Sequence, residues 1–316
     1  ASILSDRSAL AVFPTGGGKS LCYQLPALLL NELTLVVSPL IALMKDQVDS
    51  LVVKGIPAAR LDSTLSADET SKLYRRLEKN KIRLLYVAPE RLANENFRTR
   101  LSKTPLALLA IDEAHCISEW GHNFRPDYLK LTRFANELKI PRVLCLTATA
   151  TPQVAKDICR HFQIQPQDHH QLTFYRANLD LVITPIAAHD RREYILKQLQ
   201  KSATQPTIIY TTLQHGAESL ASFLKSKGLS VRPYHAGLRS EARSEIQEAF
   251  MSGEVPIICA TIAFGMGIDK SDIRAIYHYN LPKSLENYTQ EIGRAGRDGK
   301  QAHCELLACE DDLRTL

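Results

Sequence analysis

The stretch that decides the fold is Phe13-Pro-Thr-Gly-Gly-Gly-Lys-Ser20, which joins an apolar run ending at Phe13 to the largely apolar segment 21–30. The order strand, glycine turn and helix start is the one that a phosphate-binding loop requires. Glycines let consecutive backbone N–H groups curl around an anion, and the following helix directs the positive end of its dipole at that anion. A glycine turn beside an incidental lysine is the alternative, and the flanking strand and helix patterns argue against it.

The residues of this loop can be given individual tasks. We expect Lys19 to reach the β and γ phosphates of a nucleotide, and the Ser20 hydroxyl to hold Mg²⁺. The other nucleotide contacts are expected from the preceding loop residues, which are Thr15, Gly16, Gly17 and Gly18. Because position 13 is Phe where the general pattern has its first glycine, the match is to a shorter form of the loop.

The composition is that of an ordinary globular protein, with 316 residues, 45% of them hydrophobic, and a net charge of +5. This length predicts two domains, and so small a charge permits a polyanionic partner without demonstrating one. No apolar run approaches the roughly 20 residues of a membrane span, and no signal-peptide pattern opens the sequence. We therefore expect no membrane contact and a location in the cytoplasm, at the bacterial nucleoid, or in a eukaryotic nucleus. The seven cysteines form no CxxC pair, which predicts reduced thiols and no zinc.

Apolar runs alternate with helical patterns or proline-led turns along the first half of the chain. The runs are residues 33–38, 82–87, 106–111 and 142–146. Continuous apolar strands with helices between them predict a parallel sheet that is covered on both faces. Ligands of such sheets bind at the carboxyl ends of the strands, so functional residues should directly follow strands.

The acidic pair Asp112-Glu113 obeys this rule, because it directly follows the run 106–111. A carboxylate at the end of an apolar strand is unfavourable unless it is hydrated, paired or close to a cation. We expect Asp112 to hold the Mg²⁺ that bridges the nucleotide phosphates, and Glu113 to polarise the attacking water. An acid pair that merely caps a helix is the alternative, and the phosphate loop earlier in the chain argues against it.

Three motifs in this order resemble those of superfamily two helicases: Pro14-Thr-Gly-Gly-Gly-Lys-Ser20, Asp112-Glu-Ala-His115 and Thr147-Ala-Thr149. The intervening segment, residues 116–128, resembles the aromatic-rich loop that marks the RecQ family of DNA helicases. This resemblance implies two tandem RecA-like α/β domains, each a mostly parallel sheet flanked by helices, with ATP and Mg²⁺ as cofactors. It also implies a monomeric motor of DNA recombination and repair, which moves 3′ to 5′ on single-stranded DNA and unwinds forked duplexes.

The aromatic-rich loop offers three candidate DNA contacts. Trp120 and Phe124 present ring faces to bases, and Arg125 can meet a phosphate or stack. Large aromatics are more often core residues, but the surrounding Gly, His, Asn and Pro argue against a packed helix. One base–aromatic stack returns roughly 1 to 3 kcal/mol, which can offset the about 1.4 kcal/mol of parting one base-pair step. Our hypothesis is that this loop reports bound DNA to Glu113 and His115.

A polar stretch, residues 163–171, has neither helical nor strand periodicity. We therefore predict a hinge there, between a first domain, 1–165, and a second domain, 172–316. Two histidines in the stretch are more often solvated than metal-bound. Strand–helix alternation resumes after it without a second phosphate loop, so the second domain should complete the nucleotide site of the first.

The segment Gln290-Glu-Ile-Gly-Arg-Ala-Gly-Arg-Asp-Gly299 resembles motif six of these helicases. A guanidinium that stabilises the transferring phosphoryl group accelerates turnover roughly 10³- to 10⁵-fold. We expect Arg297 to be this arginine finger, with Arg294 beside it and Gln290 in the same catalytic set. A solvated arginine pair is the alternative.

Other sites are implied by the resemblance alone. Residues 261–269 resemble motif five, in which Gly267 and Asp269 would contact the nucleotide and Thr261 the DNA. DNA contacts are also implied for Ser38, Arg91 and His235. A helix cap would explain Ser38 almost as well. The arginine usual in motif four is missing here, which puts that contact in doubt.

Features at both ends of the family's motor are missing from the sequence. The adenine-reading glutamine should precede the phosphate loop, and a zinc module and winged helix should follow the motor. We therefore expect a motor fragment or a family member without these parts. Two other functions stay open, an RNA helicase of the same superfamily and an ATP-gated nucleic-acid clamp or annealing module.

Overall fold

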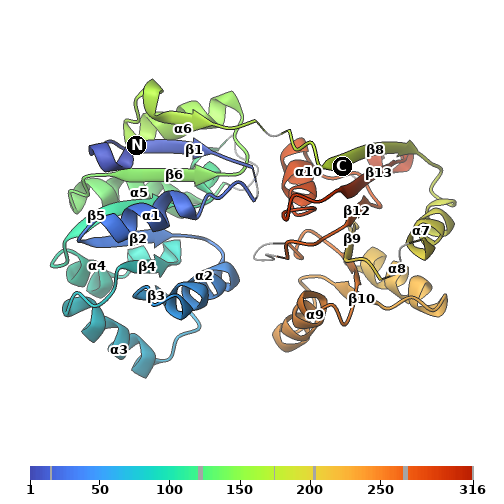
Figure 1. The fold of residues 1–316 in the computed structure, drawn as a ribbon, viewed down its shortest axis with the longest axis horizontal. Helices are drawn as coiled ribbons and strands as arrows, with labels where there is room; N and C mark the ends of the chain where they lie inside the picture. Colours follow the sequence, from blue (N-terminus) through green and yellow to red (C-terminus); the bar gives the residue numbers. More distant parts are fainter. Residues whose placement is uncertain (15, 120–123, 174, 202–203, 266–269, 315–316) are drawn as a thin grey trace. The chain divides into compact units, whose positions relative to one another are not determined.

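The apolar runs of the first half form one parallel sheet in the computed structural model, which describes residues 1–316 except 15, 120–123, 174, 202–203, 266–269 and 315–316. The chain folds as two units, Ala1–Phe174 and Tyr175–Leu316, each built on its own sheet (Figure 1). All strand pairs given for these sheets are parallel. The prediction of two α/β domains with mostly parallel sheets is confirmed.

The first sheet has the strand order β3-β4-β2-β5-β6-β1-β7. Its strands are β1 (Ala9–Val12), β2 (Leu33–Val37), β3 (Ala58–Leu61), β4 (Leu84–Val87), β5 (Leu106–Ile111), β6 (Val143–Thr147) and β7 (His169–Gln171). All six residues of β5 are buried, since helices cover both faces of the sheet. Because β6 lies between β1 and β5, the loops after these three strands are neighbours at the carboxyl edge.

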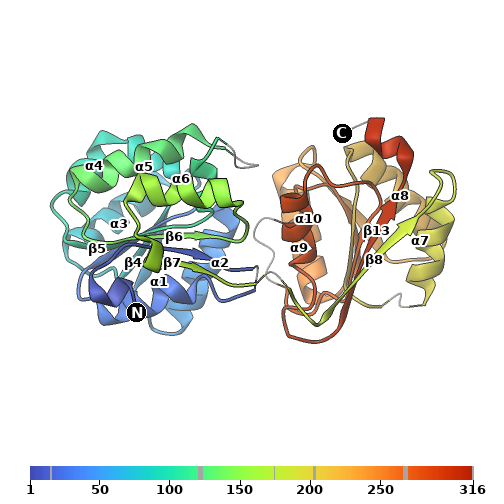
Figure 2. The same cartoon turned by 90° about the horizontal axis from the view of Figure 1, so that it is seen from above.

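In the described part of this unit the sheet is flanked by the helices α1 (Leu21–Leu29), α2 (Ile41–Val53), α3 (Ala67–Glu78), α4 (Glu95–Leu101), α5 (Pro126–Glu137) and α6 (Pro152–Phe162). Figure 2 shows α1 and α2 on one face and α4, α5 and α6 on the other. Two separate apolar clusters fill these faces, one with Tyr23 and Met44, the other with Phe97 and Phe134. Fully burying a side chain such as Met44 or Phe97 contributes roughly 1.5 to 3 kcal/mol to the stability of the fold. The two clusters therefore fix the sheet between its helices.

The second sheet has the order β10-β11-β9-β12-β13-β8. Its strands are β8 (Leu179–Pro185), β9 (Thr207–Tyr210), β10 (Val231–Tyr234), β11 (Ile257–Ala260), β12 (Ala275–His278) and β13 (Ala302–Ala308). Its helices are α7 (Arg191–Gln200), α8 (Gln214–Ser226), α9 (Ser240–Ser252) and α10 (Leu285–Ile292). Apolar residues of α7 and α8 pack in one core cluster, and those of α9 and α10 in another.

The segment 163–171, predicted as the hinge, belongs to the first unit. Residues 169–171 form β7, which pairs in parallel with β1, and Asp168 accepts a 3.0 Å hydrogen bond from Arg7 Nε. The boundary between the units falls after Phe174. Polar composition concealed this strand because β7 is an edge strand whose side chains are largely exposed, so burial imposes no apolar pattern on it.

The described residues contain neither a candidate membrane-spanning helix nor a candidate metal-binding cluster. Among these residues no helix has both the length and the apolar character needed to cross a bilayer. Within the same part of the chain, no three His, Cys, Asp or Glu side chains gather as metal ligands. The seven cysteines are free thiols, and five of them are buried.

A charged cluster joins the last two strands of the second sheet. On β13, His303 Nδ1 lies 2.8 Å from Asp180 Oδ2 of β8, and its Nε2 lies 3.1 Å from Glu305 Oε2. The hydrogen bond to Glu305 raises the pKa of His303 against the opposing effect of burial, and Asp180 adds to the increase. Protonated His303 therefore stabilises the edge of this sheet.

We expect His303→Gln to lower the free energy of unfolding most near pH 6, and progressively less at higher pH. A group whose pKa is raised by folding contributes stability that is fully present below its usual pKa of about 6.5 and is lost above its folded pKa. Urea unfolding at pH 6 and pH 9 measures the difference, with His189→Gln at an exposed site as the control. An equal loss at both pH values would show that the charge of His303 plays no part.

Candidate active site

The glycine loop lies between β1 and α1, as predicted. Gly16 and Gly18 have φ angles of 81° and 78°, a backbone region that L side chains rarely adopt. A Cβ on Gly17 would lie 2.9 Å from the Pro14 carbonyl oxygen. The backbone thus favours glycine at three consecutive positions, and a loop without side chains is the kind in which backbone N–H groups bind a phosphate. Thr15, also assigned to this loop, lies outside the described residues.

Lys19 is held over this loop. Its Nζ lies 3.2 Å from the Phe13 carbonyl oxygen and 3.4 Å from that of Pro14. The ammonium also acts on the end of β5, since it opposes the rise in the pKa of Asp112. The predicted phosphate-binding cation and the predicted acid therefore belong to one electrostatic site.

Asp112 is a half-buried carboxyl group whose close neighbour Glu113 is also acidic. Burial, and then the neighbouring Glu113, raise its pKa to about 7 against the effect of Lys19. A divalent cation would relieve both causes, and the oxygens of Asp112 and Ser20 are of the type that Mg²⁺ prefers. The donor types of Ser20 and Asp112 therefore fit Mg²⁺, and their role as its ligands stays a prediction.

Neighbouring strands hold this acid in place. Asp112 Oδ2 accepts a 3.4 Å hydrogen bond from Ser38 Oγ, and its Oδ1 accepts one of 3.0 Å from the Glu113 N–H. The buried Tyr128 hydroxyl donates to the Asp112 carbonyl at 3.0 Å. Ser38 was predicted to contact DNA, but its side chain is buried and faces the acid, because β2 and β5 are adjacent strands that end together.

A histidine connects the acidic pair to the segment after β6. His115 Nδ1 lies 2.9 Å from Thr147 Oγ1 and 3.3 Å from Glu113 Oε2. Thr147 donates its hydroxyl proton to the Thr149 carbonyl at 2.9 Å, so the imidazole is the donor from Nδ1. Burial lowers the pKa of His115 to about 4, with contributions from Arg125 and Lys19, so the ring is neutral at pH 7. Glu113 itself has a φ of 50°, which turns its side chain out of the strand direction.

The described ends of the aromatic-rich loop are anchored beside this site. Ser118 Oγ donates to Asp157 Oδ2 of α6 at 2.8 Å, and the Arg125 N–H donates to the Cys116 carbonyl at 2.9 Å. Phe124 and Arg125 are half-buried. Trp120 lies outside the described residues. Sequence analysis missed Asp157, because no local pattern marks a helix residue whose partner is 39 positions away.

The other predicted DNA contacts all follow strands or lie close to strand ends, and each makes a hydrogen bond or a close polar contact within the protein. Arg91 donates from its guanidinium to the Asp62 carbonyl oxygen after β3. His235 is 4% exposed, and its Nε2 lies 3.0 Å from Glu218 Oε1. Thr261 is buried, and its N–H donates to the Tyr234 carbonyl at 3.1 Å. These contacts were not visible in the sequence, since each joins the residue to a partner that is not adjacent in the chain.

The predicted finger segment follows α10. Gln290 lies in the last turn of that helix, and Arg294 and Arg297 lie in the turns beyond it. Arg294 donates to the Gly265 carbonyl oxygen, and a Cβ on Gly265 would lie 2.6 Å from the Arg294 guanidinium carbon. Arg294 thus ties the finger segment to the predicted motif five. Gly267 and Asp269 of that motif lie outside the described residues.

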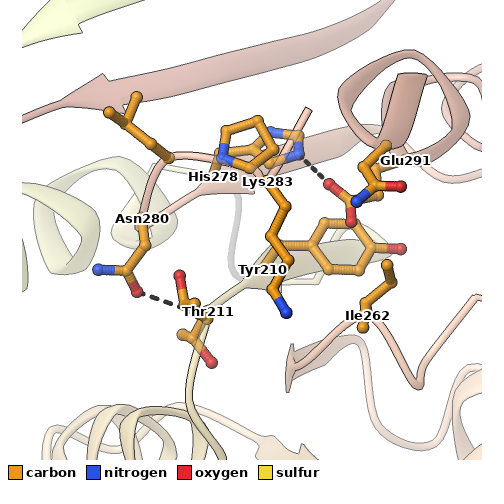
Figure 3. A pocket seen from close by; sticks show the side chains of 11 residues that line it. Tyr210, Thr211, Ile262, His278, Asn280, Lys283 and Glu291 are labelled. Atoms are coloured by element: carbon orange, nitrogen blue, oxygen red, sulfur yellow. Dashed lines mark hydrogen bonds and ion pairs between the residues drawn. The ribbon is translucent and has the colours of Figure 1, made fainter. Parts of the chain in front are cut away.

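A small pocket lies at the carboxyl ends of β9, β11 and β12 (Figure 3). In its wall, His278 Nε2 lies 2.7 Å from Glu291 Oε2, and the Tyr210 ring stacks on His278 with centroids 5.5 Å apart. The Tyr210 hydroxyl donates to the Phe264 carbonyl at 3.0 Å. These buried contacts connect three strand ends to α10 and so fix the helix that carries Gln290. Sequence analysis missed the His278–Glu291 pair.

Comparison with known proteins identifies the class to which the chain belongs. Residues 1–158 match the DEAD/DEAH box helicase family, and residues 190–299 match the helicase conserved C-terminal domain. The chain therefore belongs to the DEAD/DEAH box helicases.

Within that class the chain is similar to RecQ helicases along nearly its whole length. It is 42% identical to the ATP-dependent DNA helicase RecQ of Bacillus subtilis, over 97% of this chain and 52% of that protein. It is also 42% identical to RecQ of Pasteurella multocida, over 96% and 48%, and to the ATP-dependent DNA helicase Q5 of Rattus norvegicus, over 99% and 34%. The predicted resemblance is confirmed, and the chain spans about half the length of these relatives or less.

Solved structures share the fold at lower identity. The DUF1998 helicase MrfA bound to DNA has a TM-score of 0.78 at 20% identity, over 98% of this chain and 45% of that one. The DEAD-box helicase Mss116 bound to single-stranded RNA and UDP-BeF has a TM-score of 0.77 at 21% identity, over 98% and 69%. Both similarities support the two-domain α/β architecture.

Proposed function

We propose that this chain is the motor of an ATP-dependent DNA helicase, which moves 3′ to 5′ along single-stranded DNA and separates duplexes. The observation that carries the proposal is the glycine cradle after β1 together with the half-buried carboxyl of Asp112, with Lys19 acting on both. The RecQ helicases to which the chain is similar support DNA as the track. We propose that it acts as a monomer on single-stranded and forked DNA.

The chain's own residues have the following tasks. The cradle and Lys19 hold the phosphates of ATP, and Ser20 and Asp112 hold Mg²⁺, which neutralises phosphate charge when bound. Glu113 polarises the attacking water. Neutral His115 contacts both Glu113 and Thr147 and so keeps the two side chains in fixed positions relative to each other. Arg297 of the second unit stabilises the charge on the transferring phosphoryl group.

The aromatic-rich loop is proposed to sense DNA. Its ends are fixed by Ser118 and Arg125, and the Arg125 guanidinium is close enough to lower the pKa of His115. A base stacked on Trp120 or Phe124 would shift the loop against these anchors and so reach Glu113 through His115. This route connects nucleic acid to hydrolysis within the first unit.

A titration of ATPase rate against single-stranded DNA tests the proposal. We expect the rate to rise and saturate with DNA, to respond less to RNA of equal length, and to lose most of its stimulation in Trp120→Ala. Equal stimulation by RNA would indicate an RNA helicase. A DNA-stimulated ATPase that fails to unwind a duplex with a 3′ overhang would indicate a clamp or annealing module.

A further inference from the structure

The turn before Arg297 is held by two side chains from the start of the second unit. Arg176 donates from Nη1 to the Gly293 carbonyl at 3.1 Å and from Nη2 to the Gly296 carbonyl at 2.5 Å. Asn178 Nδ2 donates to the same Gly296 carbonyl at 2.8 Å and to the Lys300 carbonyl at 2.9 Å. Four hydrogen bonds to backbone carbonyls thus come from two residues that precede the turn by more than 100 positions.

The backbone at position 296 of this turn favours glycine. Gly296 has a φ of 54°, and a Cβ there would lie 2.6 Å from Asn178 Nδ2 and 2.7 Å from the Lys300 carbonyl oxygen. Arg176 can hold two carbonyls at once because a guanidinium presents its N–H groups in a rigid planar fork. A lysine at position 176 would supply a single flexible ammonium and could not hold both carbonyls in one geometry.

The backbone on both sides of Arg297 is also bonded to the loop before β12. The Gly296 N–H donates to the Ile273 carbonyl at 2.9 Å, and the Asp298 N–H donates to the Ser271 carbonyl at 3.1 Å. Residue 297 is therefore fixed by N–H bonds on each side and by the carbonyl fork before it. Such a fixed backbone sets the direction in which the Arg297 side chain leaves the turn.

We propose that Arg176 and Asn178 are positioning residues for the arginine finger, which they aim by clamping the carbonyls of Gly293 and Gly296. The proposal rests on the role given to Arg297 above. The clamp begins at the second residue of the unit Tyr175–Leu316, so the segment that connects the two units also braces the finger. A residue that aims the finger acts on the transition state and leaves nucleotide binding unchanged.

The test compares Arg176→Gln, Arg176→Lys and Asn178→Ala in DNA-stimulated ATP hydrolysis. We expect Arg176→Gln to lower kcat by on the order of 10- to 100-fold, with KM, ADP affinity and the thermal midpoint nearly unchanged. Affinity for ADP with aluminium fluoride should fall by a similar factor. Arg176→Lys should recover part of the loss, and Asn178→Ala should show the same pattern more weakly. The matched control is Arg142→Gln. Arg142 also donates from its guanidinium to a backbone carbonyl, that of Ala107, which lies near the start of β5, away from Asp112. This substitution should leave kcat unchanged.

A double-mutant cycle with Arg297→Ala decides whether the clamp acts through the finger. ADP–aluminium fluoride affinity serves as the readout, because it stays measurable when turnover is lost. If the clamp only aims Arg297, Arg176→Gln should weaken this affinity no further in the Arg297→Ala background. The inference would be overturned if Arg176→Gln lowered this affinity equally in the Arg297→Ala background. It would also be overturned if Arg176→Gln left kcat unchanged, or lowered kcat only in proportion to the folded fraction. Full turnover in Arg297→Ala alone would instead overturn the proposed finger.

Discussion

Arg297→Ala should reduce DNA-stimulated ATP turnover by about 10³- to 10⁵-fold while leaving ADP affinity nearly unchanged. The guanidinium is expected to act on charge that develops at the transferring phosphoryl group, and such charge exists only in the transition state. Its neighbour Arg294 is already engaged with the Gly265 carbonyl oxygen, so Arg294 cannot take over the task without breaking the contact between motifs five and six.

Steady-state turnover with saturating single-stranded DNA, and binding of a fluorescent ADP analogue, measure the two quantities separately. Arg232→Ala removes an exposed arginine from β10 of the same unit and should change neither. If Arg297→Ala keeps turnover within a few-fold of the wild type, the finger must be another residue.

Glu113→Gln is the second substitution with a large expected effect. It keeps the size of the side chain and removes the charge that polarises water, so kcat should fall by about 10²- to 10⁴-fold while ATP still binds. Glutamine meets the same backbone restriction as glutamate at a φ of 50°, and the substitution should therefore leave the fold intact.

Single-turnover hydrolysis and ATP binding without turnover provide the two measurements. Glu137→Gln, on the exposed side of α5, is the matched control and should hydrolyse ATP at the wild-type rate. A Glu113→Gln protein that hydrolyses ATP at the normal rate would place the base on another residue and refute the assignment.

Part of the site could be predicted because its information is local. The glycine loop needs left-handed backbone angles at Gly16 and Gly18, and glycine adopts them without strain, so a short stretch of sequence identifies the loop. Asp112 and Glu113 could be assigned because a parallel strand ends where its apolar run ends. The strand–helix alternation predicted the sheets because each buried strand appears in the sequence as one apolar run.

Sequence reasoning missed contacts in which a polar residue or segment is held by a distant partner. The boundary between the units falls after Phe174, beyond the predicted hinge, and β7 is recognisable only by its pairing with β1 because it has no apolar pattern. The side chain of Ser38, predicted to contact DNA, donates to Asp112, a residue 74 positions later. Strand order brings these two residues together, and hydrophobic periodicity does not determine strand order.

By itself the sequence determined the two sheets, the phosphate cradle and the acidic pair, since each depends on a local pattern of residues. The class of protein followed from the resemblance of its motifs to those of a known family. Only the tertiary structure decided how those parts are held. The clamp of Arg176 on Gly293 and Gly296 and the bond of Ser118 to Asp157 join segments far apart in the chain. The physical reason is that the packing of whole helices and strands brings distant segments within hydrogen-bond distance. The residues that form such a bond show no periodic pattern in the sequence around them.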